Sequence, residues 1–158
     1  MKITHRIGRS ERKRPRWQRD LVILGAVGNC LDILDAIDAL NAAAGVLRYR
    51  CVGFLDDNPA LHGTRVQGVE VLGPVACAAE LPDHVLLVNG VGSPRNVRVR
   101  GAVYAKTGLP RDRFATIVHP SAVVAPSSRL GAGVVILANV SVGANAAIED
   151  NVIVLQNS

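Results

Sequence analysis

The hydrophobic positions in the C-terminal part of the chain recur every six residues. One series is branched and aliphatic: Val124, Leu130, Ile136, Val142, Ile148 and Val154. A second series, two residues earlier, is mostly small or valine: Ala122, Ser128, Val134, Val140, Ala146, Val152 and Ser158. Neither the helical period nor the strand period of two produces both series, whereas a short strand and a turn every six residues does. The pattern therefore predicts hexapeptide repeats of a parallel β-helix, with Gly131 and Gly143 at tight corners. An irregular β-meander is the alternative.

The N-terminal part alternates apolar runs with amphipathic segments. A strand over 21–24 leads through a glycine turn into a helix that ends at Gly45. The further segments are strands over 48–55, 85–88 and 114–118, a brief helix over 74–81 and a helix over 94–107. Strands that alternate with helices indicate a parallel sheet with right-handed crossovers. The fold class is therefore α/β, a small Rossmann-like domain followed by the start of a β-helix.

Glycine and acidic residues follow three of the predicted strands. Because ligands bind at the carboxyl ends of strands in such sheets, these residues are the candidate site: Gly25, Gly28, Asn29, Asp56, Asp57, Gly90, Gly92 and Ser93. The glycines let phosphate oxygens approach the backbone, and the first helix presents free amides to an anion. The acidic pair can accept hydrogen bonds from a ribose or a base. The alternative is a tight turn without a ligand.

A dinucleotide-dependent oxidoreductase fits these residues less well. The fingerprint G-x-G-x-x-G is absent, because Val27 stands where the second glycine is expected. The acidic residue also follows Gly25 by about thirty residues, where about twenty is usual.

The net charge of +5 resides in the first residues of the chain. Residues 1–20 contain eight Lys and Arg against Glu11 and Asp20, so residues 21–158 carry a net charge of −1. We expect residues 1–20 to be a disordered basic tail. Such a tail can bind nucleic acid or an anionic membrane, but most short basic termini are only solvated, and we expect neither partner.

The remaining composition favours a cytoplasmic protein. No apolar run reaches the eighteen or so residues that span a membrane. The run after the basic tail superficially resembles an export signal, but it is short and three aspartates follow it at helical spacing. The three cysteines are widely spaced without a C-x-x-C motif, which favours reduced thiols, and the histidines are scattered, so no metal site is predicted.

Both halves together resemble the bacterial sugar acyltransferases, of the sialic acid O-acetyltransferase and UDP-amino-sugar N-acetyltransferase type. The resemblance covers roughly residues 21–158 and rests on ILGAVGN, GFLDDNPALHG, VNGVGSPRNVR and the IVHPSA segment that leads into the repeats. It implies a sheet domain for a nucleotide-linked sugar, and a left-handed, trimeric β-helix for acetyl-CoA as co-substrate. Carried over by position, the residues around the nucleotide are Gly25, Gly28, Asp56, Asp57, Gly90 and Arg95.

Two departures from the family matter. Asn29 stands where the family usually has a histidine, and Asn cannot carry a charge. The family's general base is a histidine of a later coil, so the catalytic residue is unknown and is expected beyond Ser158. His119 lies in the connector, where a structural role is favoured over catalysis.

The sequence thus predicts a basic tail over 1–20, a nucleotide-sugar-binding domain over 21–118 and a truncated β-helix over 119–158. The predicted function is an acetyl-CoA-dependent acetyltransferase of a nucleotide-linked amino sugar or sialic acid in surface-glycan synthesis. In this reading the chain is an inactive fragment. The alternatives are a non-catalytic nucleotide-sugar-binding or assembly module and, third, a nucleotide-dependent oxidoreductase.

Overall fold

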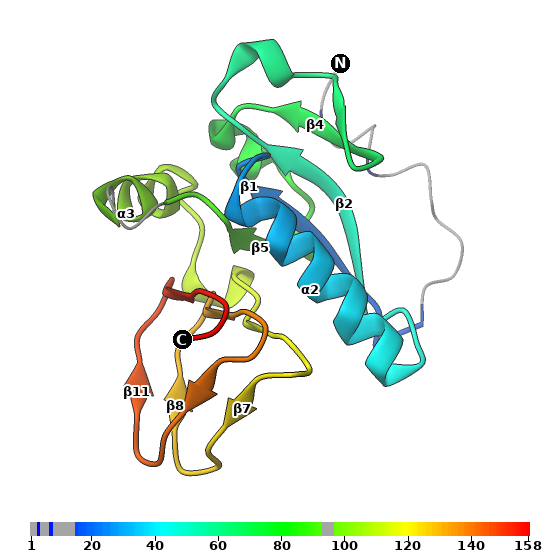
Figure 1. Ribbon diagram of the computed structural model, residues 1–158. Coiled ribbons are helices and arrows are strands. Elements are labelled where there is room, and N and C mark those ends of the chain that lie inside the picture. The colour runs from blue at the N-terminus through cyan, green and yellow to red at the C-terminus, as the bar shows by residue number, and fades with distance from the viewer. Residues whose placement is uncertain (1–2, 4–6, 8–14, 93–96) are drawn as a thin grey trace.

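The structure is a computed structural model that describes residues 3, 7, 15–92 and 97–158. A five-stranded sheet in the order β3-β4-β2-β1-β5 forms its centre (Figure 1). The strands are β1 (Arg19–Leu24), β2 (Tyr49–Leu55), β3 (Arg65–Val66), β4 (Val69–Gly73) and β5 (Val85–Asn89). β1 pairs in parallel with β2 and β5, β2 pairs in parallel with β4, and only β3 is antiparallel. The predicted parallel sheet is confirmed.

Two α-helices and three short 3-10 helices connect the strands. They are α2 (Asn29–Ala44), η2 (Pro59–Leu61), η3 (Val75–Glu80), α3 (Val97–Lys106) and η4 (Arg111–Arg113). α2 ends as predicted, because Gly45 has the left-handed backbone of a C-cap and its amide donates to Ala42 O. No helix within the described ranges is long and apolar enough to cross a membrane.

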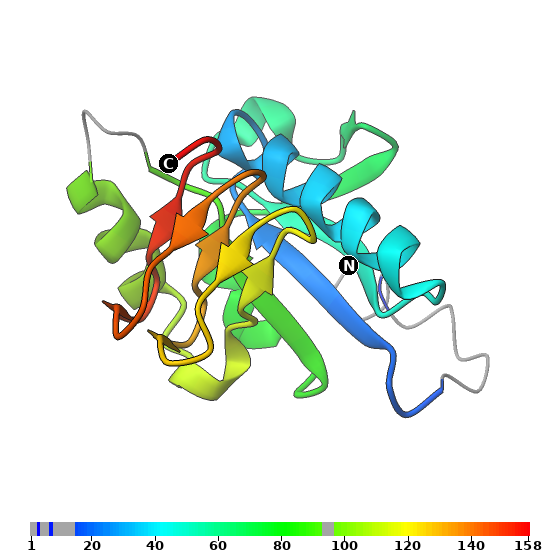
Figure 2. The ribbon, with the colours of Figure 1, turned by 60° about the horizontal axis from the view of Figure 1, so that its bottom comes forward.

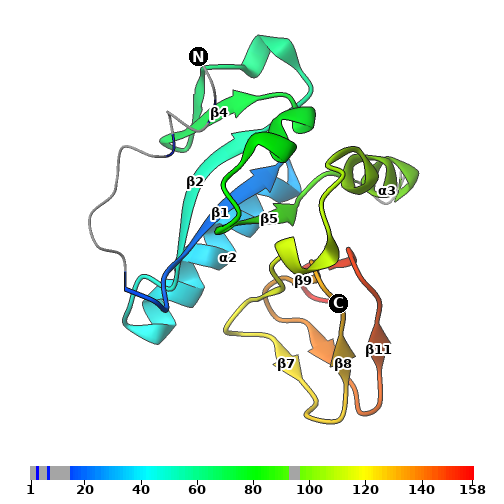
Figure 3. The same ribbon diagram turned by 180° about the vertical axis from the view of Figure 1, so that it is seen from behind.

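The two faces of the sheet bury alternate residues of each strand. Leu21 and Ile23 of β1 face α2, while Val22 and Leu24 face η3 and α3 on the other side. This alternation follows from the period of two of a strand. Figure 3, from behind, shows α2 beyond the sheet and η3 in front of it.

The segment 114–118 is not the fourth strand of this sheet, so that prediction is wrong. Phe114 makes only an isolated bridge to Leu87, and the next residues form β6 (Ile117–Val118), which pairs with β9 (Val135–Ile136). The chain leaves the sheet after one bridge, and β4 provides the further parallel strand instead.

The C-terminal part winds as a three-sided coil (Figure 2). Its further strands are β7 (Val123–Val124), β8 (Arg129–Leu130), β10 (Ser141–Val142), β11 (Ala147–Ile148) and β12 (Ile153–Val154). Parallel pairs β7–β10, β8–β11 and β9–β12 join residues eighteen apart, such as Val123 and Ser141. Three strands of six-residue spacing therefore complete one turn, as the period predicts. All six branched residues of the first series pack in the interior of this coil.

The corners of the coil differ from the prediction. Gly131 and Gly143 are not left-handed; the positive φ angles lie at Gly133, Asn139, Asn145, Asn151 and Asn157, again six residues apart. Asparagine tolerates this conformation better than other residues with a side chain. Gly131 is instead needed for close approach, because a Cβ there would meet the backbone and side chain of Asp150.

One side of the coil packs on α2. Val135, Leu137 and Ile153 point outward from the coil and join the same apolar cluster as Ile33 and Ile37 of α2. The sheet and the coil therefore share a hydrophobic core, which the repeat pattern alone did not predict.

Of residues 1–20, the structure describes Ile3, Ile7 and residues 15–20. Arg19 and Asp20 belong to β1, and Ile3 and Ile7 are buried in the cluster that contains Leu72. These four residues are part of the folded body, while the rest of the predicted tail up to residue 14 lies outside the described residues. The division into domains stays a prediction.

Candidate functional site

A cavity of about 330 Å³ lies at the carboxyl ends of β1, β2 and β5. Its lining residues are Gly25, Val27, Gly28, Asn29, Cys30, Asp56, Gly90, Val91 and Gly92. The structure thus brings together six residues that the sequence selected: Gly25, Gly28, Asn29, Asp56, Gly90 and Gly92. Their role in binding stays a prediction. The sequence analysis did not select the other three lining residues, because neither a polar side chain cluster nor a glycine pattern points to them: Val27, Cys30 and Val91.

Asp57 lies outside this cavity. Its Oδ1 accepts a hydrogen bond from the amide of Val75 at 3.0 Å, and its Oδ2 accepts one from Lys106 Nζ at 2.7 Å. The hydrogen bond from Lys106 holds the pKa of Asp57 below its usual value. Asp57 therefore joins η3 and α3 to the end of β2. Ser93 and Arg95 lie outside the described residues.

The cavity positions require glycine for two different structural reasons. Gly25 and Gly90 make room for Cys30, since a Cβ at either position would lie 2.6 or 2.5 Å from its Sγ atom. Gly28 has φ +60° and ψ −128°, and a Cβ there would have no atom within 4 Å. That backbone conformation is open essentially to glycine alone. Gly28 is therefore the position where a side chain would protrude into free space at the cavity.

Asp56 fixes the turn that follows β1. Its Oδ2 accepts a hydrogen bond from the amide of Ala26 at 2.9 Å, and its Oδ1 accepts one from the amide of Asn58 at 2.8 Å. A carboxylate has further lone pairs, so Asp56 can still accept from a ligand hydroxyl.

The first helix begins at the cavity. Gly28 is its N-cap and offers no side-chain cap, while Asn29 Nδ2 donates to Gly92 O at 2.9 Å and so joins the loop after β5. The uncapped end of a helix of sixteen residues presents a partial positive charge to the lining. This arrangement favours an anionic group such as a phosphate.

Cys30 is not suited to be a nucleophile. Its side chain is 1% exposed, and its Sγ lies 3.5 Å from Leu24 O. Burial raises the pKa of the thiol to about 12, so the group stays protonated at neutral pH.

His119 is held in the turn that it makes with Ser121. Its Nδ1 lies 2.8 Å from Ser121 Oγ and accepts a hydrogen bond from the amide of Ser121 at 3.1 Å. The ring lines a second cavity, of about 190 Å³, with Asp32, Asp35, Ala36, Leu137, Ala138 and Gln156. The structural role expected for His119 stays a prediction.

The described ranges contain no group of three or more His, Cys, Asp or Glu that could hold a metal ion.

The fold is an α/β domain with a cavity at its strand ends, joined to a parallel coil whose strands recur every six residues. No protein-family model matches the chain. A UDP-N-acetylbacillosamine N-acetyltransferase of Bacillus subtilis (strain 168) is 41% identical over 70 residues, which are 42% of this chain and 31% of that protein.

Two solved structures share the fold. The acetyltransferase domain of PglB from Neisseria gonorrhoeae FA1090, in complex with acetyl coenzyme A, has a TM-score of 0.69 and 25% identity over 87% of this chain and 62% of its own. PerB from Caulobacter crescentus, in complex with CoA and GDP-perosamine, has a TM-score of 0.67 and 29% identity over 87% of this chain and 60% of its own.

These relatives confirm the resemblance to bacterial sugar acyltransferases. They also agree with acetyl-CoA as the co-substrate, because the solved structures hold acetyl-CoA or CoA. The chain spans about a third of the curated relative and about three fifths of the solved chains.

Proposed function

We propose that the cavity at the strand ends binds the nucleotide of a nucleotide-linked amino sugar. The observation that carries this proposal is the meeting of an uncapped helix end, the open backbone at Gly28 and the carboxylate of Asp56 around one cavity. The helix end and the bare backbone suit phosphate oxygens, and Asp56 suits a ribose hydroxyl or a base N–H group.

The proposed reaction is acetyl transfer from acetyl-CoA to an amino group of that sugar. The support is that the curated relative is an N-acetyltransferase, that the matching part of PglB is an acetyltransferase domain, and that the solved structures hold acetyl-CoA or CoA. The sialic acid O-acetyltransferase alternative has no relative among these proteins.

The coil is proposed to be the first part of a left-handed parallel β-helix of hexapeptide repeats, and the assembled enzyme to be a cytoplasmic homotrimer. Strand pairs eighteen residues apart support the repeat. The free state of all three cysteines is compatible with a reducing compartment.

Acetyl transfer needs a general base, and no histidine is among the described residues that line the cavity. An amine must lose its proton as it attacks the thioester, and a neutral imidazole with a free lone pair is suited to accept it. His119 lines a different cavity. We therefore expect these 158 residues to release no free coenzyme A from acetyl-CoA in the presence of amino-sugar nucleotides.

A thermal-shift titration with UDP-, GDP- and CMP-sugars, acetyl-CoA and NAD tests the proposal. A ligand that binds only the folded state raises the melting temperature. We expect at least one nucleotide sugar to raise it and NAD to leave it unchanged. A shift with NAD alone would favour the oxidoreductase, and no shift with any nucleotide would refute nucleotide binding.

A further inference from the structure

Arg100 of α3 is a buried arginine without an acidic partner among the described residues. Its side chain makes two hydrogen bonds, from Nε to Asn151 O at 2.5 Å and from Nη1 to Val91 O at 3.1 Å. The residue is only 7% exposed, and its buried Nη2 has no hydrogen-bond partner among the residues that the structure describes. A buried charge of this kind is costly unless another group compensates it.

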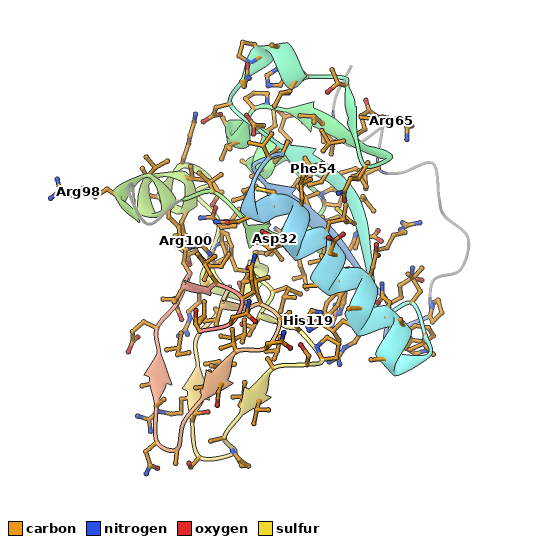
Figure 4. All side chains as sticks on the ribbon, in the orientation of Figure 1. Asp32, Phe54, Arg65, Arg98, Arg100 and His119 are labelled. Atoms are coloured by element: carbon orange, nitrogen blue, oxygen red, sulfur yellow. The ribbon has the colours of Figure 1, made fainter. Side chains whose placement is uncertain are left out.

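The guanidinium lies directly behind the wall of the strand-end cavity. Val91 and Gly92 line the cavity, and a Cβ at Gly92 would lie 3.2 Å from the Cβ of Arg100. Because Val91 lines the cavity, its hydrogen bond with Arg100 places the guanidinium next to a lining residue. Figure 4 shows Arg100 directed toward the middle of the molecule, whereas Arg98 of the same helix points away from it.

Arg100 also belongs to a polar junction between the sheet and the coil. Asn89, at the end of β5, donates from Nδ2 to Arg100 O and to Asn151 Oδ1, each at 3.0 Å. Its Oδ1 accepts a hydrogen bond from the amide of Val91 at 3.0 Å. The loop after β5 is thus fixed to a corner of the coil by Asn89 and Arg100 together.

The two hydrogen bonds that Arg100 donates to carbonyl oxygens do not require a charged side chain, because a neutral amide can also donate two hydrogen bonds. The charge is nevertheless kept: burial lowers the pKa of Arg100 only to about 10, so the group is protonated at neutral pH. An anion in the adjacent cavity is a group that would compensate this charge, since Coulomb attraction is strong where water is excluded.

We propose that Arg100 is a positioning residue for the phosphate groups of the nucleotide. It fixes Val91 and Gly92 against Asn151 of the coil and supplies a positive charge behind the phosphate-binding wall. This inference rests on the proposed function, because it names the part of the ligand that Arg100 attracts.

The test compares three variants of the full chain by calorimetric titration with UDP, GDP, pyrophosphate and uridine. Arg100→Met removes the charge and both hydrogen bonds at similar length, Arg100→Lys keeps the charge, and Arg98→Met removes an exposed charge from the same helix. The loss of a positive charge behind the phosphate-binding wall predicts a loss of about tenfold in UDP affinity for Arg100→Met. Uridine affinity should change less than about twofold, because uridine carries no phosphate. Arg100→Lys should lose less than Arg100→Met, and Arg98→Met should resemble the unchanged chain.

Hydrogen exchange of the Val91 and Gly92 amides, without any ligand, tests the positioning separately. We expect faster exchange in Arg100→Met and unchanged exchange in Arg98→Met. Equal losses of UDP and uridine affinity would overturn the phosphate role, and unchanged exchange would overturn the positioning role. If the unchanged chain binds none of the four probes, the proposed function itself fails. Should Arg100→Met not fold, Arg100→Gln decides, because it removes the charge and keeps two donors: a loss of UDP affinity no larger than that of uridine would overturn the inference.

Discussion

Asp56 and Ala26 are joined by a hydrogen bond of 2.9 Å, so that the acidic residue after β2 holds the glycine turn after β1. This bond fixes two of the three loops that line the cavity relative to each other. The sequence analysis predicted that Asp56 binds a ligand. The structure shows that Asp56 also holds the turn after β1 in the free protein.

Replacement of Asp56 by alanine should therefore affect both stability and binding. Asp56→Ala leaves the amides of Ala26 and Asn58 without their acceptor, and we expect the free energy of unfolding to fall by about 1–3 kcal/mol. Nucleotide affinity should fall as well, because the turn loses its support. The measurements are urea unfolding and calorimetric titration. Asp112→Ala, an exposed substitution, is the control, and an Asp56→Ala variant of unchanged stability would contradict the role.

The corners of the coil provide a second prediction. Asn145 has φ +60° and is exposed, so its replacement tests the backbone conformation with little change in packing. Asn145→Gly should be tolerated, whereas Asn145→Val should lower the free energy of unfolding by about 1–2 kcal/mol. Ala144→Val, at the neighbouring exposed position with ordinary φ, should change it far less. Equal effects of the two valine substitutions in thermal unfolding would contradict the left-handed corner.

The buried thiol of Cys30 predicts a loss of stability at alkaline pH. Because its pKa is raised to about 12 in the folded state, the folded chain keeps a proton that the unfolded chain releases near pH 9. The contribution of the thiol is thus fully present below about pH 9 and declines above it, by up to about 1.4 kcal/mol per pH unit. Unfolding in urea at pH 8, 9 and 10 should give a smaller decline for Cys30→Ala than for Cys77→Ala, whose side chain is only partly buried. Equal declines would show that Cys30 is not held protonated.

Features that depend on the local spacing of residues were predicted well from the sequence. Features that depend on contacts between distant segments were predicted poorly. The stacked positions from Val124 to Val154 and the C-cap at Gly45 follow from spacing and from backbone preference. The pairing of β6 with the coil was missed, because an apolar pair such as Ile117–Val118 fits a sheet or a coil equally well.

The same limit applies to the candidate site. Loop glycines and Asp56 were found because strand ends meet in a parallel sheet. Arg100 was missed because it lies in a helix with a second arginine, Arg98, and only the fold shows that Arg100 is the buried one. Asp57 was included with Asp56 because adjacency in sequence does not reveal that its two oxygens bind Val75 and Lys106 instead.

Calorimetric titration of nucleotide sugars into Gly28→Ala and Gly45→Ala tests whether nucleotides bind at the strand ends. Both glycines have positive φ and free space around a Cβ, and both flank α2, but only Gly28 lines the cavity. We predict that Gly28→Ala abolishes or strongly weakens binding, while Gly45→Ala, which also puts a side chain at a positive φ, binds like the unchanged chain. Equal nucleotide affinity of the two variants would contradict the account.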